Sequence, residues 1–194
     1  MDIRRVVIIA LLAALIVAGA YISIPIGPVP ITLQTLFILL AGLLGGRRIG
    51  IPAVAVYLAL GAMGLPVFSG GTGGFARFFS PTGGFLLSWL PAVAIAGICS
   101  DLGYRPASQE EQTATKKHLL WMILGAVSAT IIIYAIGLPI LKLNLDFSWS
   151  KTIAIGMLPF LPGDLLKLAS AVILGNLFSP KVRSFINTNV QEAP

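Results

Sequence analysis

The chain has 194 residues, with 13 basic and 7 acidic side chains and a formal net charge of +6. Only 10 % of its residues are charged, 57 % are hydrophobic, and the mean hydropathy is +0.95. Soluble domains carry about 25 % charged residues, so this composition excludes a soluble globular protein. It predicts an all-α integral membrane protein that forms a single domain over residues 1–194.

Six apolar runs are predicted to be transmembrane helices, because about 20 apolar residues cross a bilayer. The predicted spans cover residues 6–24, 33–45, 49–67, 84–100, 119–141 and 152–178. The second span is short, and Pro159 and Pro162 interrupt the sixth. Irregular backbone at membrane depth occurs where protein or water satisfies its polar groups. We therefore expect these two segments to line a cavity.

Basic residues gather at alternate ends of the predicted spans. One side holds Arg77, Lys142 and Lys151. The other side holds Arg4, Arg5, Arg47, Arg48, Arg105, Lys116, Lys117, Lys181 and Arg183. The positive-inside rule places the more basic side, and with it both termini, in the cytoplasm. The net charge therefore indicates membrane topology, and nucleic-acid binding is not predicted.

The first predicted span has a second interpretation. Arg4 and Arg5, the apolar stretch and the triplet Ala18-Gly19-Ala20 resemble a signal peptide with its cleavage site. We expect the helix to stay uncleaved, because the apolar character continues to Ile24.

Small residues recur along this first helix, where Ala10, Ala14 and Ala18 are spaced at i, i+4 and i+8. Small side chains at this spacing form a groove that lets another helix backbone approach closely. The groove is either a docking surface for a partner helix or a packing face inside the protein. The sequence alone leaves both interpretations open.

Two segments on the less basic side carry polar residues and glycine. Residues 24–35 hold three prolines and the hydrogen-bonding side chains Thr32, Gln34 and Thr35, which favours either a simple turn or a ligand-facing segment. Residues 66–84 hold six glycines. Phe75, Phe78 and Phe79 surround Arg77 within this segment, and Phe85 follows directly after it.

The glycine-rich segment is predicted to be an ordered lid over an apolar site, with a flexible loop as the alternative. Its glycines, Gly83 among them, let backbone amides approach a ligand closely. Neither of the glycine spacings that bind nucleotide phosphates occurs in it, and no strand precedes it. We therefore predict no cofactor and no ATPase activity, and the sequence indicates no metal site.

Asp164 and Lys167 are the charged residues that the sixth predicted span places inside the membrane. A charge at bilayer depth costs at least about 2.5 to 3.5 kcal/mol, so such residues indicate a functional site. Their i,i+3 spacing puts both on one helix face, within reach of one ligand or of each other. A salt bridge that only fixes the helix is the alternative.

Two other classes of protein remain open from the residues alone. An intramembrane enzyme would use Asp164 as its base, but no second carboxylate, histidine or nucleophile is predicted beside it. A structural membrane protein would need neither the buried charges nor the glycine-rich lid.

Four blocks of the sequence together resemble the BioY family, the biotin-specific substrate-binding (S) components of energy-coupling factor (ECF) transporters. The blocks are IPIGPVPITLQTLFILLAGLLGGRRIG, GLPVFSGGTGG, SPTGGFL and LPFLPGDLLK. The resemblance implies a six-helix S-component fold in the cytoplasmic membrane of a prokaryote. It also implies high-affinity biotin binding near the outer surface as the first step of uptake. The implied partners are a membrane-embedded T component, which would meet the alanine groove, and two cytoplasmic ATPases.

The resemblance also implies roles for particular side chains. Asp164 would accept the ureido N–H groups of biotin, and Lys167 would donate to the ureido carbonyl or to the valerate carboxylate, of which we favour the ureido group. Gln34 would add a hydrogen bond, and Arg77 is a second candidate for the carboxylate. The predicted site comprises Thr32, Gln34, Phe75, Arg77, Phe79, Gly83, Tyr134, Asp164 and Lys167, with Phe75, Phe79 and Tyr134 packed on the ring system.

Overall fold

The computed structural model describes residues 2–104 and 116–187. Its α-helices are α1 (Ile3–Tyr21), α2 (Gln34–Gly45), α3 (Arg47–Ala62), α4 (Gly83–Gly103), α5 (Lys116–Leu145), α6 (Trp149–Gly156) and α7 (Leu161–Asn187). Two strands, β1 (Ser23–Ile24) and β2 (Ile31–Thr32), and a 3-10 helix, η1 (Phe75–Phe79), lie in the connections. Arg105, one of the predicted cytoplasmic residues, lies outside the described residues.

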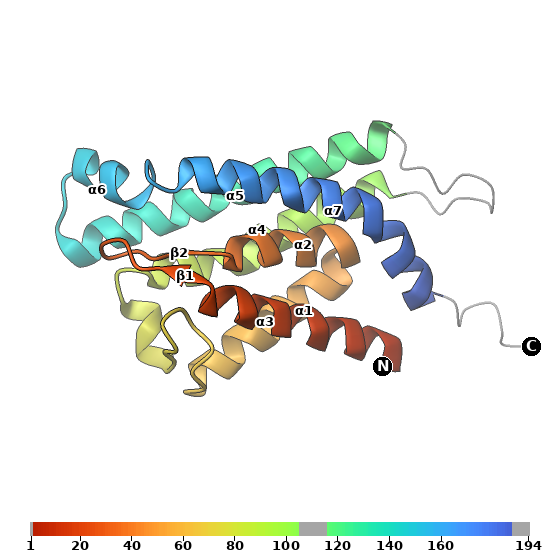
Figure 1. Ribbon diagram of the computed structural model, residues 1–194, viewed down its shortest axis with the longest axis horizontal. Coiled ribbons are helices and arrows are strands. Elements are labelled where there is room, and N and C mark those ends of the chain that lie inside the picture. Colours follow the sequence, from red (N-terminus) through yellow and green to blue (C-terminus); the bar gives the residue numbers. More distant parts are fainter. Residues whose placement is uncertain (1, 105–115, 188–194) are drawn as a thin grey trace, which may run out of the picture.

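The helices run along the long axis of the molecule (Figure 1). The start of α1 and the end of α7 lie at one end, which we call the terminal end. The strands and α6 lie at the opposite end, which we call the loop end. The two strands and the break between α6 and α7 therefore lie at the end opposite to the start of α1.

Four helices of the described chain, α1, α4, α5 and α7, are long and apolar enough to cross a membrane. The prediction of six membrane spans is not confirmed as a whole, because α2 has 12 residues and α3 has 16. A straight crossing of the hydrocarbon core takes about 20. The expected shortness of the second span is seen in α2.

The sixth predicted span, 152–178, is two helices and not one. α6 ends at Gly156 and α7 begins at Leu161. Pro159 lies in the break and has no N–H group to continue a helix. Pro162 is the second residue of α7, in the first turn, where an N–H group would have no intrahelical acceptor. The two prolines therefore divide the span at the loop end.

The centre of the bundle is α2, which packs against α1, α3, α4 and α7. Gly42 faces α4, where an added Cβ atom would lie 2.8 Å from the Ala96 Cβ and 3.0 Å from the Val93 carbonyl oxygen. Only a residue without a side chain fits there, so the two helix backbones approach closely. This packing fixes α2, and with it the start of the helix at the loop end.

The first proline-rich connection forms a short hairpin that the sequence did not predict. Ser23 pairs with Thr32 and Ile24 with Ile31 in antiparallel register. The prolines between the strands cannot donate backbone hydrogen bonds, so each strand pairs over only two residues. The hairpin delivers Thr32 directly to the first turn of α2.

Candidate functional site

A cavity of about 210 Å³ lies at the loop end. Its wall is formed by the β1–β2 connection, the segment before α4, the first turns of α4, the later part of α5 and the break between α6 and α7. Aromatic rings supply much of the wall: Phe68, Phe85, Trp89 and Phe160. The cavity is thus apolar, with a few polar side chains at defined places, as is usual for small-molecule sites.

The charged pair lies in the wall of this cavity, on the first two turns of α7. Lys167 Nζ donates to Asp164 Oδ1 at 3.0 Å. The two side chains are 9 % and 16 % exposed, respectively. Asp164 also lies near the N-terminus of α7, where a negative charge is favoured. Both partners line the cavity, so their salt bridge leaves them accessible to a ligand.

Tyr134 reaches the same carboxylate from α5 and donates its hydroxyl hydrogen to Asp164 Oδ2. Each Asp164 oxygen therefore has one protein donor, Lys167 on one and Tyr134 on the other. A carboxylate offers about four acceptor positions, so it can accept further N–H groups. The Tyr134 ring lies edge-on to Phe85, with ring centroids 6.5 Å apart.

Thr32 and Gln34, which also line the cavity, begin a chain of hydrogen bonds that leads into the bundle. The Thr32 hydroxyl donates to Gln34 Oε1 at 3.1 Å, and Gln34 Nε2 donates to the Tyr57 hydroxyl oxygen at 2.5 Å. Tyr57 in turn donates to the Val67 carbonyl oxygen at 3.2 Å. These bonds orient the Gln34 amide, which lines the cavity while being 4 % exposed.

Arg77 lines the cavity from η1. Its Nε and Nη2 donate to Thr72 Oγ1 at 3.1 and 2.7 Å, and the Thr72 hydroxyl donates to the Ser69 carbonyl oxygen at 2.9 Å. One guanidinium group thus connects η1 to the turn at residues 69–72 within the glycine-rich segment. Two of the five N–H donors of Arg77 are used in these bonds.

Phe75 and Phe79, which were predicted to pack on the ring system of the ligand, do not line the cavity. They are 66 % and 70 % exposed, and their centroids are 5.7 Å apart. Of the three η1 rings, Phe78 is partly buried, whereas Phe75 and Phe79 are exposed. Phe78 packs edge-on against Phe68, which lines the cavity.

The aromatic wall was only partly predictable. Trp89 was missed, although Phe85 and Trp89 are spaced at i,i+4 and share one face of α4. Phe160 was missed as well, because it lies in the break that only the folded chain brings to the cavity.

Lys142 and Lys151 do not line the cavity. The Lys142 Nζ lies 5.7 Å from the centroid of the Trp149 ring, and the Lys151 Nζ lies 4.0 Å from the centroid of the Phe147 ring.

Gly83 does not line the cavity either, and its role is packing. It is buried at the start of α4, and an added Cβ atom would lie 2.0 Å from the Phe78 carbonyl oxygen. Because the clash is with backbone, η1 would have to move away from α4. Gly83 thus determines how closely the glycine-rich segment packs over the cavity.

Replacing Gly83 by alanine is therefore expected to destabilise the protein by about 1 to 3 kcal/mol, the usual range for overpacking. Thermal unfolding of the detergent-solubilised chain measures this. Gly163→Ala is the matched control, because an added Cβ at Gly163 meets nothing within 4 Å. Equal melting temperatures for the two variants would show that Gly83 is not a close-packed position.

The alanine groove lies on the outside of α1. Ala10, Ala14 and Ala18 are exposed, whereas the buried face of the helix holds Ile9, Leu12, Ala13, Ile16, Gly19 and Ala20. The groove is therefore not a packing face inside this chain. It is available to lipid or to another protein.

Within the described residues, no group of three or more His, Cys, Asp or Glu side chains is placed to hold a metal ion. The charges that face the cavity are Asp164, Lys167 and Arg77. The site can therefore bind a polar ligand through charged donors and acceptors while enclosing an apolar portion between aromatic rings.

Comparison with known proteins matches residues 1–184 to the BioY family. A protein named biotin transporter BioY from Thermotoga maritima is 36 % identical over 171 residues, covering 88 % of this chain and 93 % of that protein. A probable biotin transporter BioY from Pyrococcus horikoshii is 37 % identical over 174 residues, covering 90 % and 95 %. A solved structure described as the S-component for biotin from an ECF-type ABC transporter has a TM-score of 0.76, 30 % identity and 90 % coverage of both chains.

Proposed function

Since this chain belongs to the BioY family, we propose that it takes up biotin as the S component of an ECF-type transporter, with the loop-end cavity as its biotin site. The ion pair of Asp164 and Lys167 in the wall of an aromatic cavity carries the assignment of the site. The relatives are named as transporters, so the interpretation of Asp164 as an enzymatic base is dropped.

The polar groups of the cavity complement the ureido ring of biotin, which has two N–H donors and one carbonyl acceptor. Asp164 accepts from the N–H groups through its remaining lone pairs, and Lys167 donates to the carbonyl oxygen. Tyr134 and Lys167 hold the carboxylate in place before the ligand arrives. Because the pair is already formed and largely buried, little reorganisation is needed on binding.

The valerate carboxylate of biotin needs a cation at a different place. Arg77 is the remaining cationic side chain among the described residues of the wall, and three of its N–H groups are not engaged with Thr72. A guanidinium group pairs well with a carboxylate because its donors match the two oxygens. Binding of the tail by Arg77 would also hold the glycine-rich segment over the ligand.

The remaining features of an S component are proposed from the distribution of charge. We assign the terminal end, with both termini, to the cytoplasm, because the basic residues concentrate there. The six predicted spans would then correspond to α1 to α5 and the α6–α7 pair. Energy for uptake would come from a T component and two cytoplasmic ATPases, since the chain has no phosphate-binding loop of its own.

Competition by biotin analogues tests the site and the orientation of the ligand together. Biocytin and biotin amide lack the free valerate carboxylate, whereas 2-iminobiotin replaces the ureido carbonyl by an imino group. We expect biotin to bind best and 2-iminobiotin to lose more affinity than biocytin, because it places a donor against Lys167. The opposite order would assign Lys167 to the carboxylate, and equal affinity of all analogues would reject the site.

A further inference from the structure

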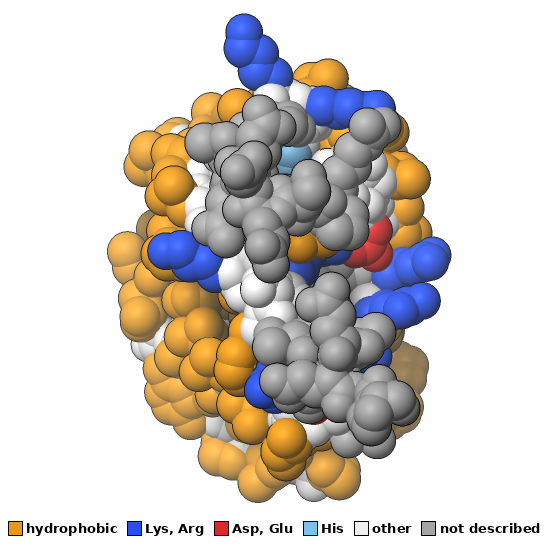
Figure 2. All heavy atoms as spheres, turned by 90° about the vertical axis from the view of Figure 1, so that its right-hand side faces the viewer, with side chains coloured by type: hydrophobic (Ala, Val, Ile, Leu, Met, Phe, Trp, Pro, Cys, Tyr) orange, Lys and Arg blue, Asp and Glu red, His pale blue; other side chains and the backbone are white. Residues whose placement is uncertain are grey.

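A second cavity lies at the terminal end, far from the biotin site. It has a volume of about 400 Å³ and is lined by the ends of α1 and α4, the corner between α2 and α3, and the last turns of α7. Among the described residues, four arginines line it together with a single acidic side chain: Arg5, Arg47, Arg48, Arg183 and Asp101. Figure 2 shows this end, where basic side chains surround the middle and hydrophobic side chains cover the flanks.

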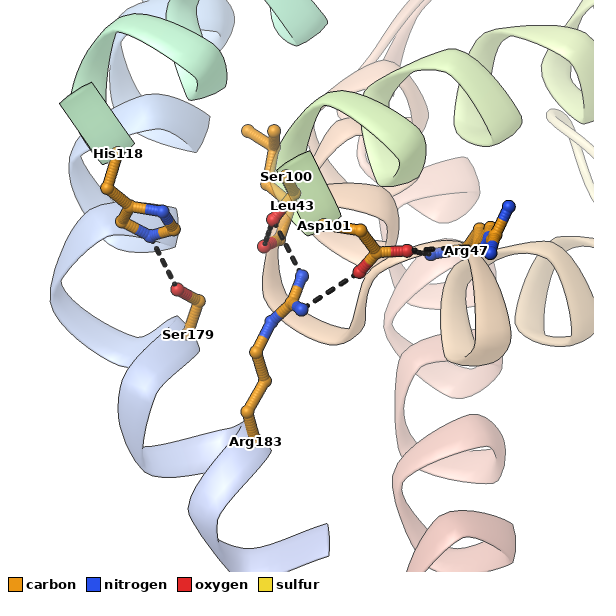
Figure 3. Close-up of polar contacts among 7 residues, drawn as sticks. All are labelled: Leu43, Arg47, Ser100, Asp101, His118, Ser179 and Arg183. Atoms are coloured by element: carbon orange, nitrogen blue, oxygen red, sulfur yellow. Dashed lines mark hydrogen bonds and ion pairs between the residues drawn. The ribbon is translucent and has the colours of Figure 1, made fainter. Parts of the chain in front are cut away.

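The acidic side chain, Asp101, is already bound by groups of the protein itself. Arg183 reaches from α7 to α4, where Nη1 lies 2.8 Å from Asp101 Oδ1 and Nη2 donates to Ser100 Oγ at 2.9 Å (Figure 3). Asp101 Oδ2 accepts from the Arg47 backbone N–H at 3.2 Å. Gly46, with φ of 65°, makes this approach possible, since an added Cβ would lie 1.9 Å from Asp101 Oδ1.

Two of the other cations, Arg5 and Arg48, are not neutralised by the part of the chain that the structure describes. Arg5 and Arg48 take part in none of the ion pairs within residues 2–104 and 116–187. Arg47 shares the single charge of Asp101 with Arg183: its side chain is 58 % exposed, and its Nε lies 3.7 Å from Asp101 Oδ2. The buried Nε atoms of Arg5 and Arg183 have no hydrogen-bond partner there. Within the described ranges, positive charge therefore exceeds negative charge around this cavity.

We propose that this arginine cavity binds the phosphate of an anionic phospholipid headgroup. Guanidinium groups bind phosphate oxygens through paired hydrogen bonds, and basic pockets between transmembrane helices suit such headgroups. The neighbouring surface is apolar: Ile3 on α1 is 70 % exposed and Phe185 on α7 is 46 % exposed. Acyl chains of the same lipid would lie against these residues, which a soluble phosphate would not need.

The test uses the purified full chain in lipid-free detergent, titrated with phosphatidylglycerol or phosphatidylcholine of identical acyl chains. Native mass spectrometry counts the lipid bound. The test variant is Arg5→Gln with Arg48→Gln, which leaves the contacts of Asp101 intact. The control is Lys116→Gln with Lys117→Gln, which removes equal charge from exposed positions of α5 at the same end and outside the cavity.

The unmodified chain should bind one phosphatidylglycerol at concentrations where phosphatidylcholine does not bind. A basic side chain near the headgroups contributes about 1 kcal/mol, so the double arginine variant should lose roughly thirtyfold in phosphatidylglycerol affinity. The lysine control should retain it. Arg48→Gln alone, at an exposed position, should lose about fivefold, and this gives a readout if the double variant does not fold.

Three results would overturn the proposal. Equal binding of the two lipids would show that the cavity does not recognise the anionic headgroup. Equal loss in the arginine and lysine variants would show attraction to general surface charge. Displacement of phosphatidylglycerol by millimolar inorganic phosphate would assign the cavity to a soluble anion instead of a lipid.

Discussion

Replacing Lys167 by alanine should weaken biotin binding by about 2 to 5 kcal/mol, the range for breaking a buried, hydrogen-bonded charge pair at an interface. Each 1.4 kcal/mol is about tenfold in affinity. The variant loses the donor to the ureido carbonyl and leaves the Asp164 carboxylate with Tyr134 as its protein partner. Equilibrium binding of labelled biotin to the purified variant measures the loss.

Two further variants make this result interpretable. Asp164→Asn keeps the shape of the side chain and should also bind weakly, because an NH2 donor replaces one of the two acceptor oxygens and the negative charge is lost. Lys151→Ala removes a cation from the loop end outside the cavity and should bind normally. Unchanged affinity in both site variants, with folded protein, would mean that the salt bridge only fixes α7.

Replacing Ala14 by tryptophan should abolish transport while leaving biotin binding of the isolated chain nearly unchanged. Ala14 is the middle residue of the exposed groove on α1, and a bulky ring there prevents close approach of another helix. The cavity at the loop end is formed by other elements. Co-purification with a T component and biotin uptake by cells that carry one measure the effect.

The matched control is Leu124→Trp, which adds the same ring to an exposed position on α5. It should bind biotin, co-purify and transport normally. If Ala14→Trp misfolds or loses biotin binding, the groove is needed for the structure of this chain, and the docking interpretation is wrong. Normal uptake by Ala14→Trp would place the partner surface elsewhere.

The long helices could be predicted from the sequence because they depend on local composition. Continuous apolar runs gave α1, α4 and α5 to within a few residues at most ends, and Pro159 and Pro162 marked the break before α7. The β1–β2 hairpin could not be predicted, because two paired residues per strand leave no alternating pattern. The predicted segment 33–45 matches α2 to within one residue, whereas α3 ends at Ala62, five residues before the predicted end of its span.

The site was predictable where it depends on spacing within one helix. The i,i+3 spacing of Asp164 and Lys167 anticipated their contact at 3.0 Å. The bond from Tyr134 to Asp164 was not foreseen, because it joins residues 30 apart on two helices. Phe75 and Phe79 were misplaced, because the sequence of η1 does not reveal a 3-10 helix or which of its rings faces inward.

Equilibrium binding of radiolabelled biotin to the purified chain, in nanodiscs without any other protein, tests the central claim most directly. Saturable binding of one biotin per chain in the micromolar range or tighter, displaced by unlabelled biotin, is the predicted result. Absence of saturable binding by folded protein would contradict the assignment of the loop-end cavity as a biotin site.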